Sequence, residues 1–145
     1  MDAKEYGKLV RGITRNVNTF IGSQIAKYGI KEGQYEYFMH IYAFPGINQL
    51  ELARLKNVGK GSVTKALKIL EEDGFIERKV DKKDRRNFRC YISTKGEKII
   101  NDLIEVKMKS EETLFRGMKK EDRIQFYTYL DILYKNSIEL LKKTN

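Results

Sequence analysis

The sequence predicts a mainly α-helical protein that carries one small β-hairpin, and three observations support this fold class. Apolar residues recur at steps of three and four over most of the 145 residues, which is the period of a helix. The chain contains a single proline, Pro45, so long helices can run without a break. Residues 75–93 instead alternate apolar and polar side chains in two short runs, a pattern typical of paired strands.

The first helix is predicted over residues 3–28, where apolar side chains such as Leu9, Ile13 and Ile21 follow the helical period. Gly29 is a plausible stop, because glycine readily takes the left-handed conformation that ends many helices. A second helix is predicted over residues 34–43. It should end there because residues 45–46, Pro-Gly, disfavour helical backbone.

A short helix over residues 49–56 and a longer one over residues 60–73 are predicted next. Asn48 and Glu51 have the spacing of a capping box, in which each side chain bonds to the backbone of the other residue. Residues 57–61, NVGKG, form the turn between the two helices. Gly74 should end the longer helix, and Phe75 can fold back over its last turn.

Two strands are predicted over residues 75–80 and 87–93, joined by residues 81–86 as a hairpin tip. In the second strand, Phe88, Cys90 and Ile92 alternate with polar residues and are expected to point inward. Ser93 or Thr94 should cap a helix that continues to about Phe115. After a break at Gly117, a last helix is predicted over residues 120–142.

The charge of the chain is concentrated in one region. The formal net charge is +9, and residues 54–95 hold 13 lysines and arginines against 6 aspartates and glutamates, a net of +7. A concentrated basic region is the usual electrostatic signature of a protein that binds nucleic acid. The alternative from charge alone is a basic surface that only keeps the protein in solution.

Several classes of protein are disfavoured by the sequence. A single cysteine, Cys90, allows no internal disulfide, and neither a signal peptide nor an apolar stretch long enough to span a membrane is present, so a cytoplasmic protein is expected. One histidine and one cysteine make a metal site improbable. With no phosphate-binding glycine loop and no nucleophile paired with a base, neither enzymatic activity nor a cofactor is predicted.

The helices at 49–56 and 60–73 form a helix-turn-helix, and the second has two distinct faces. Val63, Ala66, Leu67 and Leu70 fall on one side and should be buried. The other face is small, polar or cationic, which suits base edges and phosphates. It carries Gly61, Thr64, Lys65 and Lys68, with Lys60 and Ser62 at the start of the helix. The alternative is an amphipathic surface helix with solvated lysines.

A hairpin directly after that helix makes the arrangement a winged helix-turn-helix. Its tip offers Lys82, Lys83, Arg85 and Arg86, and arginines on a thin tip can enter a narrow minor groove. An aspartate in the tip would repel phosphate, so we expect Asp84 to pair with a neighbouring arginine and fix the geometry of the tip. The alternative is a charged β-turn whose ionic side chains serve only to keep the protein in solution.

These residues resemble the MarR family of winged-helix transcription regulators. The resemblance runs over residues 49–96 through LA, then SVTK, LEEDGFIER, DKKDRR and STKG, in order. It implies one domain over residues 1–145, with a DNA-binding lobe at about 30–96 and a helical dimerisation region at about 1–28 and 97–145. Ser62, Thr64 and Lys65 match the family's DNA-contacting positions, Arg85 and Arg86 its wing arginines, and Asp84 the acid beside them. Two positions depart from the pattern: Gly59 replaces the usual cap, and Lys56 replaces an apolar residue.

The resemblance also implies a homodimer on palindromic double-stranded DNA, most simply a repressor, with a small aromatic or phenolic effector. The candidate effector pocket comprises Tyr28, Tyr35, Phe38, His40 and Tyr42, although these can equally be core and interface residues. The alternative function is a winged-helix protein-interaction module without operator specificity. The operator, the regulated genes, the effector and the role of Cys90 do not follow from the sequence.

Overall fold

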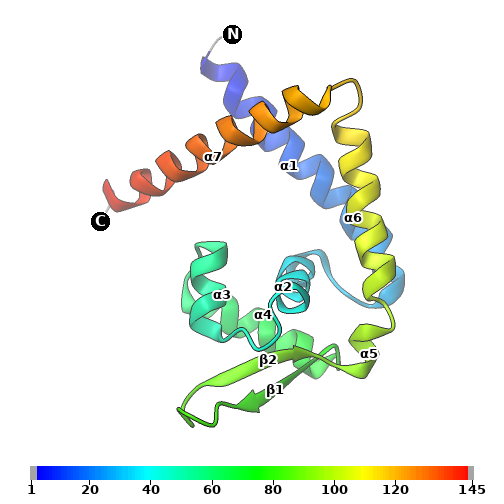
Figure 1. Cartoon of the computed structure of the whole chain (residues 1–145), viewed down its shortest axis with the longest axis vertical. Helices are drawn as coiled ribbons and strands as arrows, with labels where there is room; N and C mark the ends of the chain where they lie inside the picture. Colours follow the sequence, from blue (N-terminus) through cyan, green and yellow to red (C-terminus); the bar gives the residue numbers. More distant parts are fainter. Residues whose placement is uncertain (1–2, 144–145) are drawn as a thin grey trace. The chain divides into compact units, whose positions relative to one another are not determined.

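The computed structural model describes residues 3–143 and confirms a mainly helical fold with one two-stranded hairpin (Figure 1). The elements follow in the order α1 (Ala3–Ile25), the short 3-10 helix η1 (Ala26–Tyr28), α2 (Glu32–Ala43), α3 (Gln49–Lys56), α4 (Lys60–Glu72), β1 (Ile76–Val80), β2 (Phe88–Ile92), α5 (Thr94–Glu97), α6 (Ile100–Leu114) and α7 (Lys120–Lys143).

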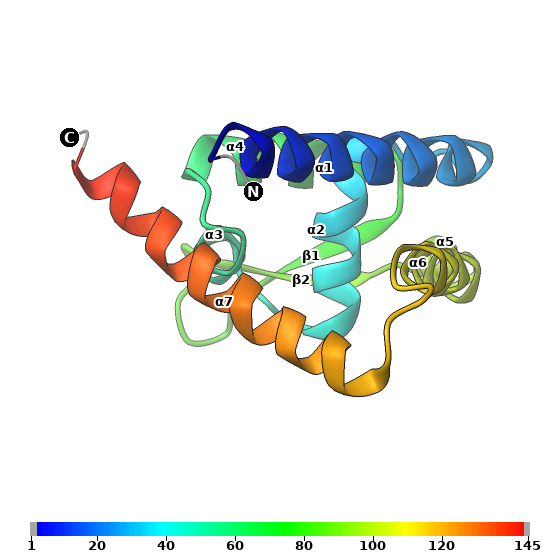
Figure 2. The same ribbon diagram turned by 90° about the horizontal axis from the view of Figure 1, so that it is seen from above.

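The chain divides into two compact units, the first ending at Ser110 and the second beginning at Glu111. The first unit is built around a core that α1, α2, α3, α4, the hairpin and α6 all supply. Figure 2 shows α1 and α2 running in clearly different directions, and the two helices are in contact. Fully buried side chains from separate elements meet in this core, namely Ile25, Phe38, Ile41, Leu52, Val63, Leu67, Leu70, Phe75, Cys90 and Leu103. The Phe38 and Phe75 rings pack edge to face with centroids 6.1 Å apart.

The predicted helix ends are largely confirmed, because most of them depend on local backbone chemistry. Asn48 and Glu51 form the capping box at the start of α3. At the end of α4, Gly74 has a φ of 82°, and the backbone N–H of Phe75 donates to the carbonyl of Leu70. That bond and the one from Gly74 to Glu71 form a Schellman motif.

Three predicted elements differ from the structure by more than one residue at a boundary or by a division of the element. The first helix is α-helical only as far as Ile25, and residues 26–28 form η1, in which the backbone N–H of Gly29 donates to the carbonyl of Ala26 in a tighter turn. The second helix begins at Glu32, two residues earlier than predicted. The predicted helix from 93–94 to 115 is divided into α5 and α6, because the N–H of Ile99 bonds to Gly96, an i→i−3 bond that tightens the backbone there.

The hairpin is antiparallel, and its register pairs Ile76 with Ile92 and Val80 with Phe88. The loop before α3 adds a short third edge to it, since Gly46 and Ile47 exchange backbone hydrogen bonds with Cys90. Cys90 is buried as predicted, but the prediction for Phe88 is wrong, since 46% of its surface is exposed. Phe88 lies at the far end of the strand pair, beyond the helices that cover Cys90.

The second unit consists of the end of α6, the turn at Gly117 and α7. Gly117 has a φ of 90° and breaks the helix as predicted. The rings of Phe115, Phe126 and Tyr127 form a small cluster, and the guanidinium of Arg123 lies 4.3 Å from the centre of the Phe115 ring. Much of α7 is exposed although it is apolar, at Ile124, Tyr129, Leu130, Ile132, Leu133, Tyr134, Leu140 and Leu141.

Candidate nucleic-acid interface

Helix α4 has the two faces that the sequence predicts. Val63, Ala66, Leu67 and Leu70 are all less than 5% exposed and hold the helix against the core. The candidate DNA-contacting residues of α4 are all exposed to solvent, namely Lys60, Gly61, Ser62, Thr64, Lys65 and Lys68. Gly59 is the N-cap and supplies no side-chain cap, so the first backbone N–H groups of α4 keep their bonding capacity. The positive end of the helix dipole adds to the cationic character of this end.

The start of α3 is tied to the start of α4 by a contact that sequence spacing does not indicate. The side-chain amide of Gln49 donates to the hydroxyl of Thr64 and, at 3.4 Å, to the carbonyl of Lys60. The Thr64 hydroxyl in turn donates to the same carbonyl, 2.9 Å away. Gln49 therefore fixes both the angle between the two helices and the position of the Thr64 hydroxyl.

Lys56, where the family pattern favours an apolar residue, lies over the core. Its ammonium lies 4.1 Å from the centre of the Tyr37 ring and 3.0 Å from the Glu36 carboxylate. The side chain is only 13% exposed. The stem of this lysine therefore replaces the missing apolar side chain while its charge is paired at the surface.

The hairpin is joined to α4 by a two-pronged ion pair. Arg78 of β1 donates from Nε and Nη2 to the two carboxylate oxygens of Glu71, each at 2.9 Å. These hydrogen bonds lower the pKa of Glu71 and raise that of Arg78. The guanidinium also lies 5.5 Å from the centre of the exposed Phe88 ring. Arg78 therefore fixes the hairpin relative to α4.

Both aspartates of the hairpin tip hold its shape. Asp84 accepts hydrogen bonds from the backbone N–H of Arg86 at 3.1 Å, from the Arg86 side chain at 3.4 Å and from the Asn87 amide at 3.3 Å. Asp81 accepts a hydrogen bond from the backbone of Lys83, and Arg89 lies 3.1 Å from its carboxylate. The Lys83 bond is the main cause of a lowered Asp81 pKa, with the Arg89 charge adding to it.

The cationic tip residues themselves are exposed. Lys82, Lys83, Arg85 and Arg86 all lie at the surface, and the Arg86 side chain is 92% exposed. The two aspartates thus bond to the backbone of the tip and to the side chains of Arg86, Asn87 and Arg89, while the cations of the tip stay accessible to a polyanion.

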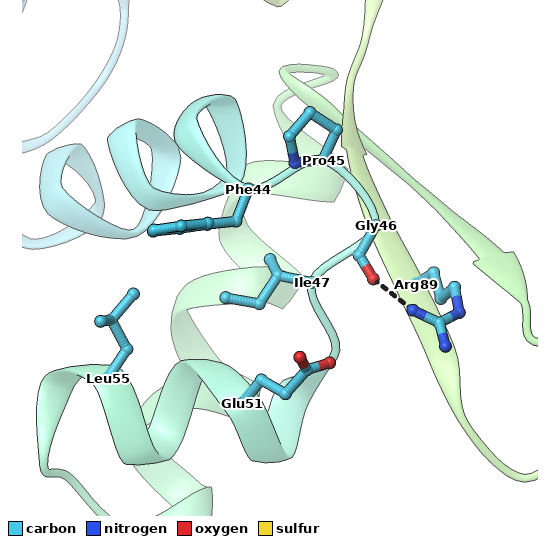
Figure 3. A pocket seen from close by; sticks show the side chains of 7 residues that line it. All are labelled: Phe44, Pro45, Gly46, Ile47, Glu51, Leu55 and Arg89. Carbon is cyan, nitrogen blue, oxygen red and sulfur yellow. Dashed lines mark hydrogen bonds between the residues drawn. The ribbon is translucent and has the colours of Figure 1, made fainter.

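A hollow of about 280 Å³ lies between the loop before α3, α3 itself and Arg89 of β2 (Figure 3). It is lined by Phe44, Pro45, Gly46, Ile47, Glu51, Leu55 and Arg89. Arg89 donates to the carbonyl of Gly46 at 3.0 Å, as the dashed line in Figure 3 marks, and so joins the loop to β2.

None of the five residues predicted as an effector pocket lines this hollow. Tyr35 and Phe38 are buried in the core, Tyr28 and His40 are half-buried, and Tyr42 is exposed. His40 lies 3.6 Å from Glu36, one helical turn away. The effector pocket therefore stays a prediction.

Within residues 3–143, no three His, Cys, Asp or Glu side chains come together as a metal site. A search of the same residues finds no helix that is long and apolar enough to cross a membrane. Cys90 is buried, and burial raises the pKa of its thiol to about 11.

Comparison with known proteins decides the family. The family model described as MarR matches residues 30–88. A MarR transcriptional regulator from Methanosarcina mazei Go1 is 30% identical, with a TM-score of 0.83 over 94% of this chain and 99% of the other. The chain belongs to the MarR family. MarR proteins are transcription regulators and not enzymes, as the sequence predicts.

One further relative fits this assignment, and a more distant structure shares the fold. The HTH-type transcriptional regulator BilQ of Clostridium symbiosum is 29% identical over 116 residues, which is 80% of this chain and 81% of BilQ. The fold is also shared with S. aureus MepR, whose structure was solved as a DNA complex. MepR is 22% identical, with a TM-score of 0.83 over 90% of this chain and 95% of MepR.

Sequence reasoning missed three positioning residues of this MarR protein. Gln49 and Arg78 each bond to α4 from another element, and Arg89 joins the hairpin to the loop before α3. Arg78 lies in the motif LEEDGFIER and Arg89 on the polar side of the second predicted strand, but neither position indicates which residue it bonds to. A glutamine at the first position of α3 does not by itself indicate a bonding partner, because Thr64 lies 15 residues further along the chain.

Proposed function

We propose that this MarR protein is a homodimeric repressor that binds a palindromic double-stranded DNA operator. Residues 30–96 form the DNA-binding lobe, and residues 1–28 and 97–145 form the dimerisation region. The protein works on genomic DNA in the cytoplasm. A small aromatic or phenolic effector releases it from the operator.

One observation carries the proposal: the N-terminal half of α4 and the tip of the hairpin both expose cationic side chains to solvent, and even Arg86, which is paired with Asp84, is 92% exposed. Lysines and arginines on such surfaces bind phosphates, while a helix in the major groove contacts base edges. The DNA-bound MepR structure supports the same use of this fold. Lys60, Gly61, Ser62, Thr64, Lys65 and Lys68 would contact DNA from α4, and Lys83, Arg85 and Arg86 from the hairpin.

The first test compares binding to the protein's own promoter region with binding to scrambled DNA, each at two salt concentrations. We expect selective binding whose affinity falls steeply as salt rises, because bound cations release counterions from DNA. Arg86→Ala should weaken binding to both DNAs and reduce the slope of log affinity against log salt by about one. Arg116→Ala, which removes an exposed arginine of the second unit, is the charge-matched control and should leave the slope unchanged.

The repressor and effector parts need a reporter gene placed behind the bound promoter. Expression should fall when the protein is present and recover when a phenolic acid such as salicylate is added. Equal affinity for promoter and scrambled DNA would contradict operator specificity and favour the protein-interaction alternative. Rising expression in the presence of the protein would make it an activator.

A further inference from the structure

The hydroxyl of Thr64 is already engaged within the protein. It donates its single hydrogen to the carbonyl of Lys60, 2.9 Å away, and it accepts a hydrogen bond from the side-chain amide of Gln49. A threonine hydroxyl has one hydrogen to donate and two lone pairs. Thr64 therefore has no hydrogen left for a base, although the residue is exposed on the face of α4 proposed to contact DNA.

The same two bonds fix the side-chain rotamer. A β-branched residue in a helix has few allowed values of χ1, and here the oxygen is held against the backbone one turn earlier. Gln49 adds a second restraint from α3 and is itself held by a bond to Lys60. The methyl group is then the part of the exposed Thr64 side chain that no hydrogen bond holds.

We propose that Thr64 recognises a thymine through apolar contact between its methyl group and the 5-methyl of the base, and that Gln49 is the positioning residue that enforces this. The inference rests on the proposed DNA binding and specifies its chemistry at one position. In the major groove, thymine differs from the other bases by this methyl group, and a threonine methyl is a suitable apolar partner.

Alternative modes of recognition give different outcomes. A hydroxyl that donates to guanine O6, adenine N7 or thymine O4 would need the hydrogen that Lys60 accepts. The remaining lone pair could accept from adenine N6 or cytosine N4. That mode depends on the oxygen, whereas the proposed one depends on the methyl group, and single-atom changes separate the two.

The test uses the duplex that the full-length protein selects from random DNA, with each thymine replaced in turn by deoxyuridine. Deoxyuridine lacks only the 5-methyl group. For wild type, each half-site should contain one thymine whose replacement, made singly, weakens binding by about fourfold. This factor corresponds to the burial of one methyl-sized group. Thr64→Val keeps the methyl and should keep this sensitivity, while Thr64→Ser keeps the hydroxyl and should lose it.

Gln49→Met, which keeps the length of the side chain but cannot donate, tests the positioning role. We expect its sensitivity to deoxyuridine to fall below that of wild type, while its affinity for scrambled DNA stays the same. A residue that only supports folding would change both affinities together. The melting temperatures of all variants establish that each is folded.

Three results would overturn the inference on different grounds. Selective binding by wild type that no deoxyuridine substitution weakens would show that no thymine methyl group is recognised. Selectivity lost in Thr64→Val and kept in Thr64→Ser would show recognition through the hydroxyl. Either result would overturn the inference and leave the proposed function intact. Failure of wild type to select any sequence would overturn the proposed function and this inference together.

Discussion

Cys90 illustrates how position determines the chemistry of a single residue. The thiol is 1% exposed, and burial raises its pKa from the ordinary 9.0 to about 11. A thiol held protonated in this way is a poor nucleophile at neutral pH. Cys90 therefore acts as a small apolar residue that packs from β2 into the core.

The raised pKa predicts an alkaline loss of stability. Since folding raises the pKa, the folded state favours the protonated thiol, and this contribution is complete below about pH 9 and lost as pH rises toward 11. Urea unfolding of wild type and Cys90→Ala at pH 7.5, 9 and 10.5 measures it. Relative to the variant, wild type should lose on the order of 2 kcal/mol over that range. Parallel profiles of unfolding free energy against pH for the two proteins would show that burial does not raise the pKa of the Cys90 thiol.

Gly96 predicts a steric effect at one residue. A Cβ added there would lie 2.5 Å from the Phe75 carbonyl oxygen and 2.7 Å from a methyl group of Ile92, so the backbone would have to move. Gly96→Ala should lower the free energy of unfolding by about 1–3 kcal/mol, measured by urea denaturation. Gly33→Ala, where a Cβ meets nothing within 4 Å, is the control and should be neutral or slightly stabilising. A neutral Gly96→Ala would mean that α5 can move away from β1.

At the scale of elements, the position of the hairpin depends on the bidentate pair between Arg78 and Glu71. The Arg78 hydrogen bonds lower the Glu71 pKa, so this stabilisation is present above the ordinary value of 4.5 and is lost as pH falls below it. Because 40% of the Glu71 side chain is exposed, solvent screening limits the pair to about 1 kcal/mol.

The corresponding prediction concerns DNA binding as well as stability. Arg78→Met should cost up to about 1 kcal/mol of unfolding free energy at pH 7 and less at pH 3.5. It should also weaken operator binding, although we assign Arg78 no contact with DNA, since the tip would no longer be held at a fixed angle to α4. Lys79→Met, the adjacent exposed cation on β1, controls for the lost charge. Equal losses of DNA affinity in both variants would show that Arg78 acts through charge alone.

The elements also show what a sequence can predict. The capping box of α3 and the Gly74 turn involve residues three to five apart, so spacing alone reveals them. The Gln49–Thr64 bond and the Arg89–Gly46 bond join residues 15 and 43 apart, and nothing in local periodicity reports such partners. The prediction that Phe88 points inward is wrong for a related reason. Alternation shows which residues share a face of a strand, but not how far along the strand other elements cover that face.

At the scale of the whole molecule, two helices are more apolar than their burial explains. On α1, Tyr6, Leu9, Val10 and Ile13 are each 46–55% exposed. On α7, Leu133, Tyr134 and Leu141 are each at least 49% exposed. Contiguous exposed apolar surface of this kind usually marks a protein–protein interface. Both helices belong to the proposed dimerisation region, and two bound recognition helices require two chains.

The last prediction is that association and operator binding are lost together. Wild type should sediment at twice the 17.0 kDa of one chain. Ile13→Glu and Leu133→Glu, each placing a charge on an exposed apolar face, should shift it toward the monomer, because burying an unpaired carboxylate is costly. Operator affinity should then fall by at least about 100-fold, as the second half-site no longer binds within the same complex. Leu55→Glu, at an apolar site on α3 that is 41% exposed, should remain dimeric.

If the Ile13→Glu and Leu133→Glu variants stay dimeric and keep full operator affinity, these faces do not form the interface. If they become monomeric with operator affinity unchanged, one chain occupies each site, and the palindromic operator is ruled out.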